Sequence, residues 1–252
     1  VMGSHATGCG AWCSGPSDVS PEEYQWGYNR MMSVEGLFGA GDAVGGTPHA
    51  FSSGSFTEGR IAAKSACQYI DDGKAEGIKV SEATLAKLKE EVFRPMEHYK
   101  IHRNDIVAGE VNPNYHNPRQ ELDRLQKLMD EYCGGVTVNY MTNDKLLSIG
   151  LKKLKIMEED LEKIAAKDLH ELLRAWEVKH RHRTSESVMQ HTLFRKETRW
   201  PGYYYRGDAL KLDDENWHVL TVSRRDPETG KYTMEKAPLY HLHDENEAAA
   251  AE

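Results

Sequence analysis

The apolar residues in the second half of the chain recur at helical spacing. A helix that begins at Ser81 is expected to end before Pro95, because proline has no backbone N–H to donate. Its apolar residues fall on one side, at Leu85, Leu88 and Val92. Residues 99–118 contain prolines and several asparagines and are expected to form a long loop.

Further helices are predicted beyond this loop. One carries its apolar face on Leu122, Leu125, Leu128, Met129 and Tyr132 and is broken by Cys133-Gly134-Gly135. The next is capped by Asn143 or Thr142 and reaches Ile164, another runs from Asp168 to Trp176, and a last stretch covers residues 184–198. Because each has a single apolar face, these helices are predicted to pack as a small bundle with ordinary Leu and Met core residues.

The N-terminal part of the chain has many glycines and short apolar runs. Residues 37–40 are predicted to form a buried strand, and the glycines that follow allow a tight turn. Ser55 and Glu58 fit a capping box that opens a helix, and Gly73 is its expected stop. A turn with one carboxylate, Asp42, before a free helix N-terminus suits a ligand with hydroxyl groups and an electron-rich edge.

The C-terminal part is rich in aromatic residues. Residues 217–220 and 232–238 are expected to be short strands around a turn over residues 226–231. The Tyr-rich segment 200–206 is a candidate protein interface, and residues 244–252 are expected to be a frayed acidic end. Helices and short strands in succession predict an α+β fold class.

Composition narrows the classes of function. The chain is 39% hydrophobic and 29% charged, which is typical of a globular protein. Its net charge of −8 gives no bulk electrostatic support for binding nucleic acid. No apolar run is long enough to span a bilayer, and no signal-peptide pattern is present, so a cytoplasmic location is expected.

Neither the cysteines nor the histidines predict a metal site. The four cysteines (Cys9, Cys13, Cys67 and Cys133) lack iron–sulfur or zinc spacing and are interpreted as free thiols. In the basic run over residues 179–183, His180 and His182 would point to different sides of a helix. This run is interpreted as a solvated helix end, which could also meet an acidic partner.

Several segments of the sequence resemble one family of flavoproteins. GLFGAGDAVGG, followed by a histidine, a Ser/Gly-rich loop and EGRIAAK, is similar to the last FAD-contacting segment of the fumarate reductase/succinate dehydrogenase flavoprotein superfamily. MGSHATGCGAW, YNRM, HAFSSGSFTEGR, DLHELLRAWE, MQHTLFRKETRWPGYYYR and LDDENW resemble the alpha subunits of dissimilatory adenylylsulfate reductases. The resemblance implies the interconversion of adenosine 5′-phosphosulfate (APS) with AMP and sulfite at FAD, with electrons exchanged through an iron–sulfur beta subunit.

The resemblance also divides the chain. Residues 1–72 would be the C-terminal part of an α/β FAD-binding domain with the return from a capping domain, 73–199 a helical domain, and 200–252 a tail at a subunit interface. The sequence has no G-x-G-x-x-G motif opening a βαβ unit, which such an FAD domain needs. We therefore expect a C-terminal portion of a longer protein, with a flavin site shared with upstream sequence and iron–sulfur clusters only on the partner. Any membrane-bound electron-transfer complex would be reached through partners.

The resemblance assigns site residues. The cofactor-binding candidates are Gly41, Asp42, Ser53, Gly54, Ser55 and Phe56. Asp42 is expected to bind FAD hydroxyls, and the N–H groups of Ser55 and Phe56 to face the flavin pyrimidine edge. His5 is the candidate catalytic and substrate-binding residue, because a histidine can bond the anionic sulfate–phosphate end. His49 and Phe56 are further substrate candidates, although Phe56 could equally be a core contact.

Two other functions stay open. In fumarate reductases the corresponding loop carries a histidine and then an arginine that binds the dicarboxylate, whereas HAFSSGSF lacks the arginine. This departure disfavours a succinate/fumarate-type oxidoreductase. The second alternative is a non-catalytic docking module. Arg30, a competing cation near the site, is assigned a structural role.

Overall fold

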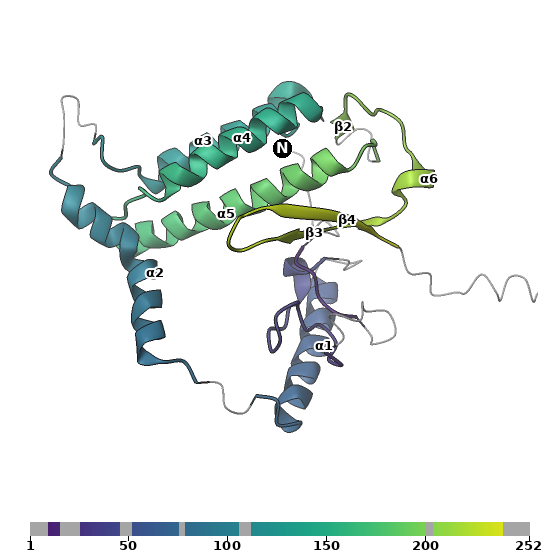
Figure 1. The fold of residues 1–252 in the computed structure, drawn as a ribbon, viewed down its shortest axis with the longest axis horizontal. Helices are drawn as coiled ribbons and strands as arrows, with labels where there is room; N and C mark the ends of the chain where they lie inside the picture. Colours follow the sequence, from purple (N-terminus) through teal and green to yellow (C-terminus); the bar gives the residue numbers. More distant parts are fainter. Residues whose placement is uncertain are drawn as a thin grey trace, which may run out of the picture. The chain divides into compact units, whose positions relative to one another are not determined.

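The structure, a computed structural model, describes residues 10–15, 26–45, 52–75, 79–105, 112–199 and 204–238. The chain separates into two compact units, Val1–Ser81 and Glu82–Glu252. Helices dominate the described residues and the sheets are two-stranded (Figure 1), so the predicted α+β class is confirmed.

In the first unit, isolated backbone bridges join the segments that precede the helix. Ala11 pairs with Val44, Cys13 with Met32, and Met31 with Phe38. The predicted buried strand over residues 37–40 is therefore wrong: Phe38 makes a single bridge, Leu37 is 49% exposed, and Arg30 on the opposite segment has a φ of 67°, which is outside the extended region. A short 3₁₀-helix, η2 (Gly41–Ala43), follows.

Helix α1 (Ser52–Asp71) begins earlier than expected. Ser55 lies inside its first turn, so the predicted capping box between Ser55 and Glu58 is wrong. Glu58 instead binds the guanidinium of Arg30, because a charge-assisted pair is stronger than a bond to a neutral backbone N–H. The helix ends at Asp71, close to the predicted stop.

The second unit is built on the helices α2 (Glu82–His102), α3 (Pro118–Tyr132), α4 (Asp144–Leu161) and α5 (Leu169–Phe194). Two predicted caps are confirmed. The Asn143 side chain accepts the Leu146 N–H at 2.9 Å, and the Asp168 side chain accepts the Glu171 N–H at 2.9 Å. The N-cap of α3 is Asn117, which forms a capping box with Gln120.

Two helices are longer than predicted. Helix α2 continues through Pro95 to His102, with a bend that Figure 1 shows. The Trp176 indole Nε1 donates to the Val92 carbonyl at 3.0 Å, in the turn that proline disrupts, so the backbone there gains an external partner. Helix α5 absorbs most of the stretch predicted as separate, because no glycine or proline interrupts residues 169–194.

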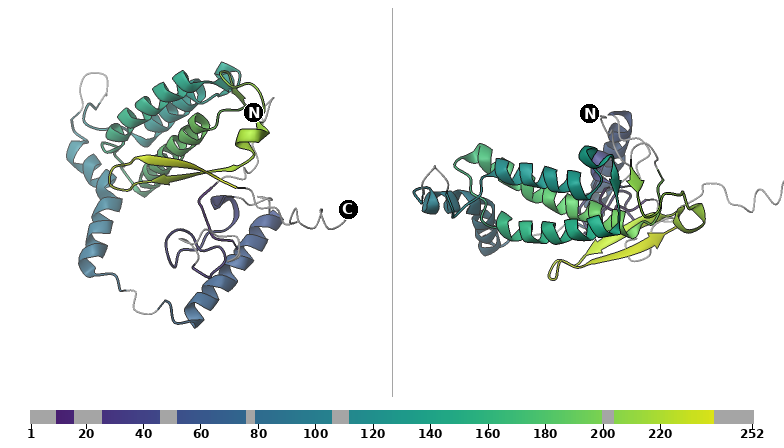
Figure 2. Two further views of the ribbon diagram at one scale, coloured as in Figure 1. Left: turned by 45° about the vertical axis from the view of Figure 1, so that its right-hand side comes forward. Right: turned by 90° about the horizontal axis from the view of Figure 1, so that it is seen from above.

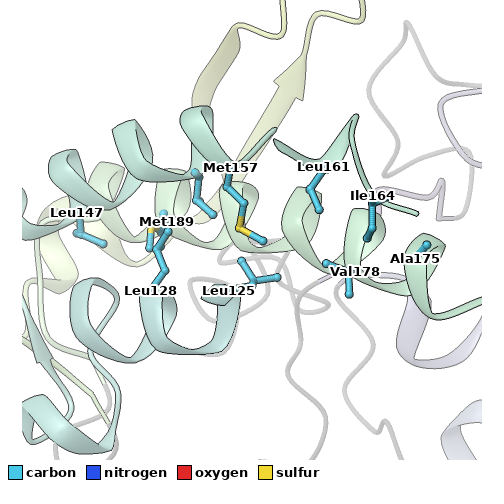
Figure 3. Packing of buried hydrophobic residues seen from close by; sticks show 10 residues of the cluster. Leu125, Leu128, Leu147, Met157, Leu161, Ile164, Ala175, Val178 and Met189 are labelled. Carbon is cyan, nitrogen blue, oxygen red and sulfur yellow. The ribbon is translucent and has the colours of Figure 1, made fainter. Parts of the chain in front are cut away.

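Helices α3, α4 and α5 lie side by side (Figures 1 and 2) and enclose the apolar core of the second unit (Figure 3). Helix α4 contributes its buried face at Leu147, Leu154, Met157 and Leu161. At Gly150 the helices approach so closely that an added Cβ would lie 2.9 Å from the Cβ of Tyr132. The predicted bundle core is therefore confirmed.

The C-terminal hairpin packs on α5. Strands β3 (Leu220–Arg225) and β4 (Tyr232–Ala237) pair antiparallel, while Trp217 belongs to a short helix, α6 (Asp214–Trp217), rather than to the first strand as predicted. The ring nitrogens of His191 lie 3.0 and 2.9 Å from the hydroxyls of Thr221 and Ser223. Burial lowers the pKa of His191, which favours the neutral ring between these hydroxyls.

A buried arginine joins the ends of two helices. The 3₁₀-helix η3 (Val136–Val138) is followed by strand β1 (Met141–Thr142). Strand β1 pairs in parallel with β2 (Tyr205–Arg206), which follows α5 in the chain. Arg206, only 1% exposed, donates to the carbonyls of Thr192 and Arg195 at the end of α5 and binds Asp144 at the start of α4. This arginine is therefore not available to a partner.

A charged network also holds the hairpin against the helices. Arg183 Nη2 of α5 donates to Glu158 Oε1 of α4 at 2.8 Å. Arg225 Nη2 of β3 lies 3.7 Å from the same carboxylate oxygen. The Lys155 ammonium and then the Arg183 guanidinium lower the pKa of Glu158 to about 2, against the opposing effect of burial.

We expect Leu154→Ala to lower the free energy of unfolding by about 2–5 kcal/mol, because it leaves a cavity in the core. Ile156→Ala, on the same helix but 56% exposed, is the matched control and should cost less than about 1 kcal/mol. Urea unfolding followed by circular dichroism measures both. Equal losses would contradict the observed orientation of α4.

Acid should weaken the second unit through Glu158. Its pKa is lower in the folded than in the unfolded chain, so its contribution is present above about pH 4.5 and is lost as pH falls toward 2. Glu158→Gln should flatten the fall of the urea midpoint between pH 5 and 2, and the exposed neighbour Glu159→Gln should not. Identical pH profiles for the two variants would refute this role.

Candidate functional site

The structure brings the Gly41 turn and the start of α1 together. Gly41 has a φ of 66°, and an added Cβ would lie 3.3 Å from the Ser55 Oγ. A larger residue would therefore be strained in its backbone and would crowd α1. Two parts of the predicted site, far apart in the motif, are neighbours in the first unit.

The other described candidates surround this contact. Asp42 is exposed in η2, Ser53 and Phe56 are exposed on α1, and Gly54 and Ser55 are half-buried. Phe56 is 80% exposed, so its interpretation as a core contact is wrong for this chain. The first N–H groups of α1 have no partner within the helix, and η2, which carries Asp42, contacts this helix.

His5 and His49 lie outside the residues that the structure describes. Their assignment to the substrate stays a prediction.

An ion pair that the sequence did not predict holds α1 in place. Arg30 binds both carboxylate oxygens of Glu58, through Nε and through Nη2, the latter at 2.9 Å. The backbone of Arg30 is itself held, since its N–H donates to Ser14 and its carbonyl accepts from Gly39. The structural role predicted for Arg30 is confirmed, and the pKa of Arg30 is raised by this bond to Glu58.

The ion pair between Arg30 and Glu58 could have been predicted from the spacing of Glu58 along α1. Glu58, Ala62, Ser65 and Tyr69 are the buried residues of α1 and recur at helical spacing, so they form one face. A carboxylate on a buried face requires a cation or hydrogen-bond donors. Arg30, the arginine of the YNRM motif, supplies them.

Aromatic residues fix the other end of α1. The ring of Tyr69 packs edge-on against Tyr28 and Phe38, with centroids 5.1 and 6.1 Å apart. The Tyr28 hydroxyl donates to the Asp72 carboxylate at 2.7 Å, and this bond raises the pKa of Tyr28 to about 12. The helix is thus held at both ends, which fixes its first turn beside Gly41.

The described cysteines and the basic run form no metal cluster. Cys13, Cys67 and Cys133 are free thiols, and burial raises the pKa of Cys13. The interpretation of residues 179–183 as a solvated helix end is wrong, because they lie within α5, where His182 is buried with its Nε2 2.8 Å from the Leu154 carbonyl. Among the described ranges, no group of three or more metal-ligating side chains comes together.

No helix within the described part of the chain is long and apolar enough to cross a membrane.

Comparisons with known proteins extend these observations. Residues 122–245 match the family model described as fumarate reductase flavoprotein C-term. The chain is 42% identical to the adenylylsulfate reductase alpha subunit of Megalodesulfovibrio gigas, over 96% of this chain and 37% of that protein.

Solved structures agree with this similarity. An adenylylsulfate reductase from Archaeoglobus fulgidus matches 92% of this chain and 37% of its own with 49% identity and a TM-score of 0.86. An adenosine-5-phosphosulfate reductase in complex with sulfite, as a covalent adduct, matches with the same identity, coverage and TM-score. The chain thus spans little more than a third of the length of these relatives.

The match covers the Gly41 turn and α1 as well as the helical unit. The chain is therefore a homologue of the C-terminal portion of the adenylylsulfate reductase alpha subunit, and its residues 122–245 match the fumarate reductase flavoprotein model.

Proposed function

We propose that the chain is part of an enzyme that interconverts APS with AMP and sulfite. The observation that carries the proposal is the 49% identity, over 92% of the chain, to a reductase whose structure contains sulfite as a covalent adduct. Sulfite is the sulfur product of APS reduction, so that complex is consistent with the same chemistry. Because the chain spans 37% of that relative, the activity would belong to the longer protein.

The residues around Gly41 fit one edge of FAD. Gly41 lets the turn lie close to Ser55, the exposed Asp42 carboxylate could accept from ribityl or ribose hydroxyls, and the first N–H groups of α1 could donate to the pyrimidine edge. Partial positive charge at this helix end would stabilise negative charge on the ring. FAD, when bound, would supply the electron transfer to and from sulfur. The pyrophosphate and the rest of the cofactor need residues outside this chain.

Three residues are proposed to contact the substrate, namely His5, His49 and Phe56. His5 would bond the sulfate–phosphate group of APS and act in catalysis, and His49 would provide a second donor near it. Phe56 would pack on the adenine base or the flavin edge, and its exposure leaves its ring free to do so. The role of the protein in this scheme is to position the substrate and stabilise its charge.

We also propose that electrons pass to an iron–sulfur beta subunit in the cytoplasm, since this chain offers no described metal cluster of its own. Any membrane complex would be contacted through that partner. The alternatives are a succinate/fumarate-type oxidoreductase, which the loop without arginine disfavours, and a docking module.

One assay separates these functions. The full-length protein that contains this chain should oxidise sulfite in the presence of AMP and an artificial electron acceptor, and it should leave succinate and fumarate unchanged. Turnover of fumarate without turnover of AMP and sulfite would support the dicarboxylate alternative. Absence of both activities and of bound flavin would support the docking module.

Asp42→Ala in the full-length protein should raise the Kd for FAD about 10- to 100-fold, because a charge-assisted hydrogen bond is worth about 1.5–3 kcal/mol. The fold should be unaffected, since Asp42 is exposed. Asp71→Ala removes the same charge at the far end of α1 and is the matched control. Titration of flavin fluorescence measures both, and unchanged affinity in the Asp42 variant would remove this residue from the site.

A further inference from the structure

One apolar stripe runs the length of α2. Its residues, at intervals of three and four, are Leu85, Leu88, Val92, Met96 and Tyr99. The helical spacing of Leu85, Leu88 and Val92 predicts the first half of this stripe. These residues belong neither to the core of the helix bundle nor to the proposed site.

The C-terminal half of the stripe is packed within the second unit. Pro95, beside it, is buried, and its carbonyl accepts the Ala166 N–H at 3.0 Å. The ring of Tyr99 packs edge-on against Tyr115 with centroids 5.9 Å apart. This face of α2 is therefore packed from Pro95 onwards.

The N-terminal half of the same stripe is uncovered. Every residue of α2 from Glu82 to Arg94 is exposed, including Leu85 at 46%, Leu88 at 50% and Phe93 at 42%. Figure 1 shows this part of α2 standing away from α3, α4 and α5. A helix of three to four turns is only marginally stable in water without tertiary contacts. An ordered row of exposed apolar residues on it indicates a missing partner surface.

We propose that this half of α2 docks on an apolar surface of the same flavoprotein subunit, formed by the residues of its relatives that this chain does not span. The matched relatives contain far more polypeptide than this chain, which covers 37% of each. The stripe also continues a face that is already packed within the second unit.

The charges on this segment favour a partner in the same polypeptide. This segment carries three acidic and three basic residues, interspersed along the helix: Glu82, Lys87, Lys89, Glu90, Glu91 and Arg94. Such a balanced surface produces little net field to attract a separate, charged protein. An intrachain contact needs no steering, and its driving force is burial of Leu85, Leu88 and Val92. This inference rests on family membership and not on the proposed reaction.

Hydrogen–deuterium exchange tests the proposal without an activity measurement. In the full-length subunit, without any partner subunit, amides of residues 85–94 should exchange at least ~10-fold more slowly than in this 252-residue chain. Helix α4 should be protected in both samples, which controls for folding of the second unit. Equal exchange of residues 85–94 would overturn the proposal. So would protection that appears only after the iron–sulfur subunit is added, or only at high concentration of this chain.

A pair of variants in the full-length subunit sharpens the test. Leu88→Glu places a charge on the stripe and should abolish the ~10-fold protection and lower the Tm by several degrees. Ala83→Glu makes the same chemical change on the opposite, exposed face and should alter neither quantity. If both variants behave like the unmodified protein, the stripe is not a docking surface.

Discussion

The apolar seam between α3, α4 and α5 is the interaction on which the second unit depends. Each helix has only one apolar face, and α4 covers those of both neighbours through Leu147, Leu154 and Met157, all essentially inaccessible to solvent. At about 1.5–3 kcal/mol for each fully buried side chain, this seam outweighs any surface ion pair in the unit. The contacts of Arg206 with the end of α5, and of the β3–β4 hairpin with the side of α5, depend on the helix positions that this seam sets.

The first unit is held together mainly by polar and aromatic contacts. Its buried apolar side chains are few, and a helix with a carboxylate on its inner face cannot be held by burial alone. The bidentate bond of Arg30 to Glu58 compensates that charge and sets the position of α1. The consequence is local: the first turn of the helix lies beside Gly41, which is the arrangement that the proposed flavin site requires.

What the sequence predicted correctly depends on neighbours along the chain. The caps Asn143 and Asp168 and the spacing of the core leucines need only residues within two turns of a helix. The errors came from distant partners: Trp176 supports the Val92 carbonyl across 84 residues, and Arg30 removes Glu58 from its expected cap across 28. For the site, the Gly41 turn and its carboxylate were identifiable, but their assignment to FAD came from resemblance, since a glycine turn before a helix is not specific.

Two features of this chain each lack a part of their expected surroundings. The Gly41 turn and α1 are the proposed edge of a flavin site, while the sequence lacks the G-x-G-x-x-G motif that would hold the pyrophosphate. Helix α2 has an apolar stripe that is packed from Pro95 onwards and exposed before it. A ligand edge and an uncovered helix face are independent observations in different units. Both proposals therefore make the same kind of demand, additional residues of stated chemistry, and each is tested without the other.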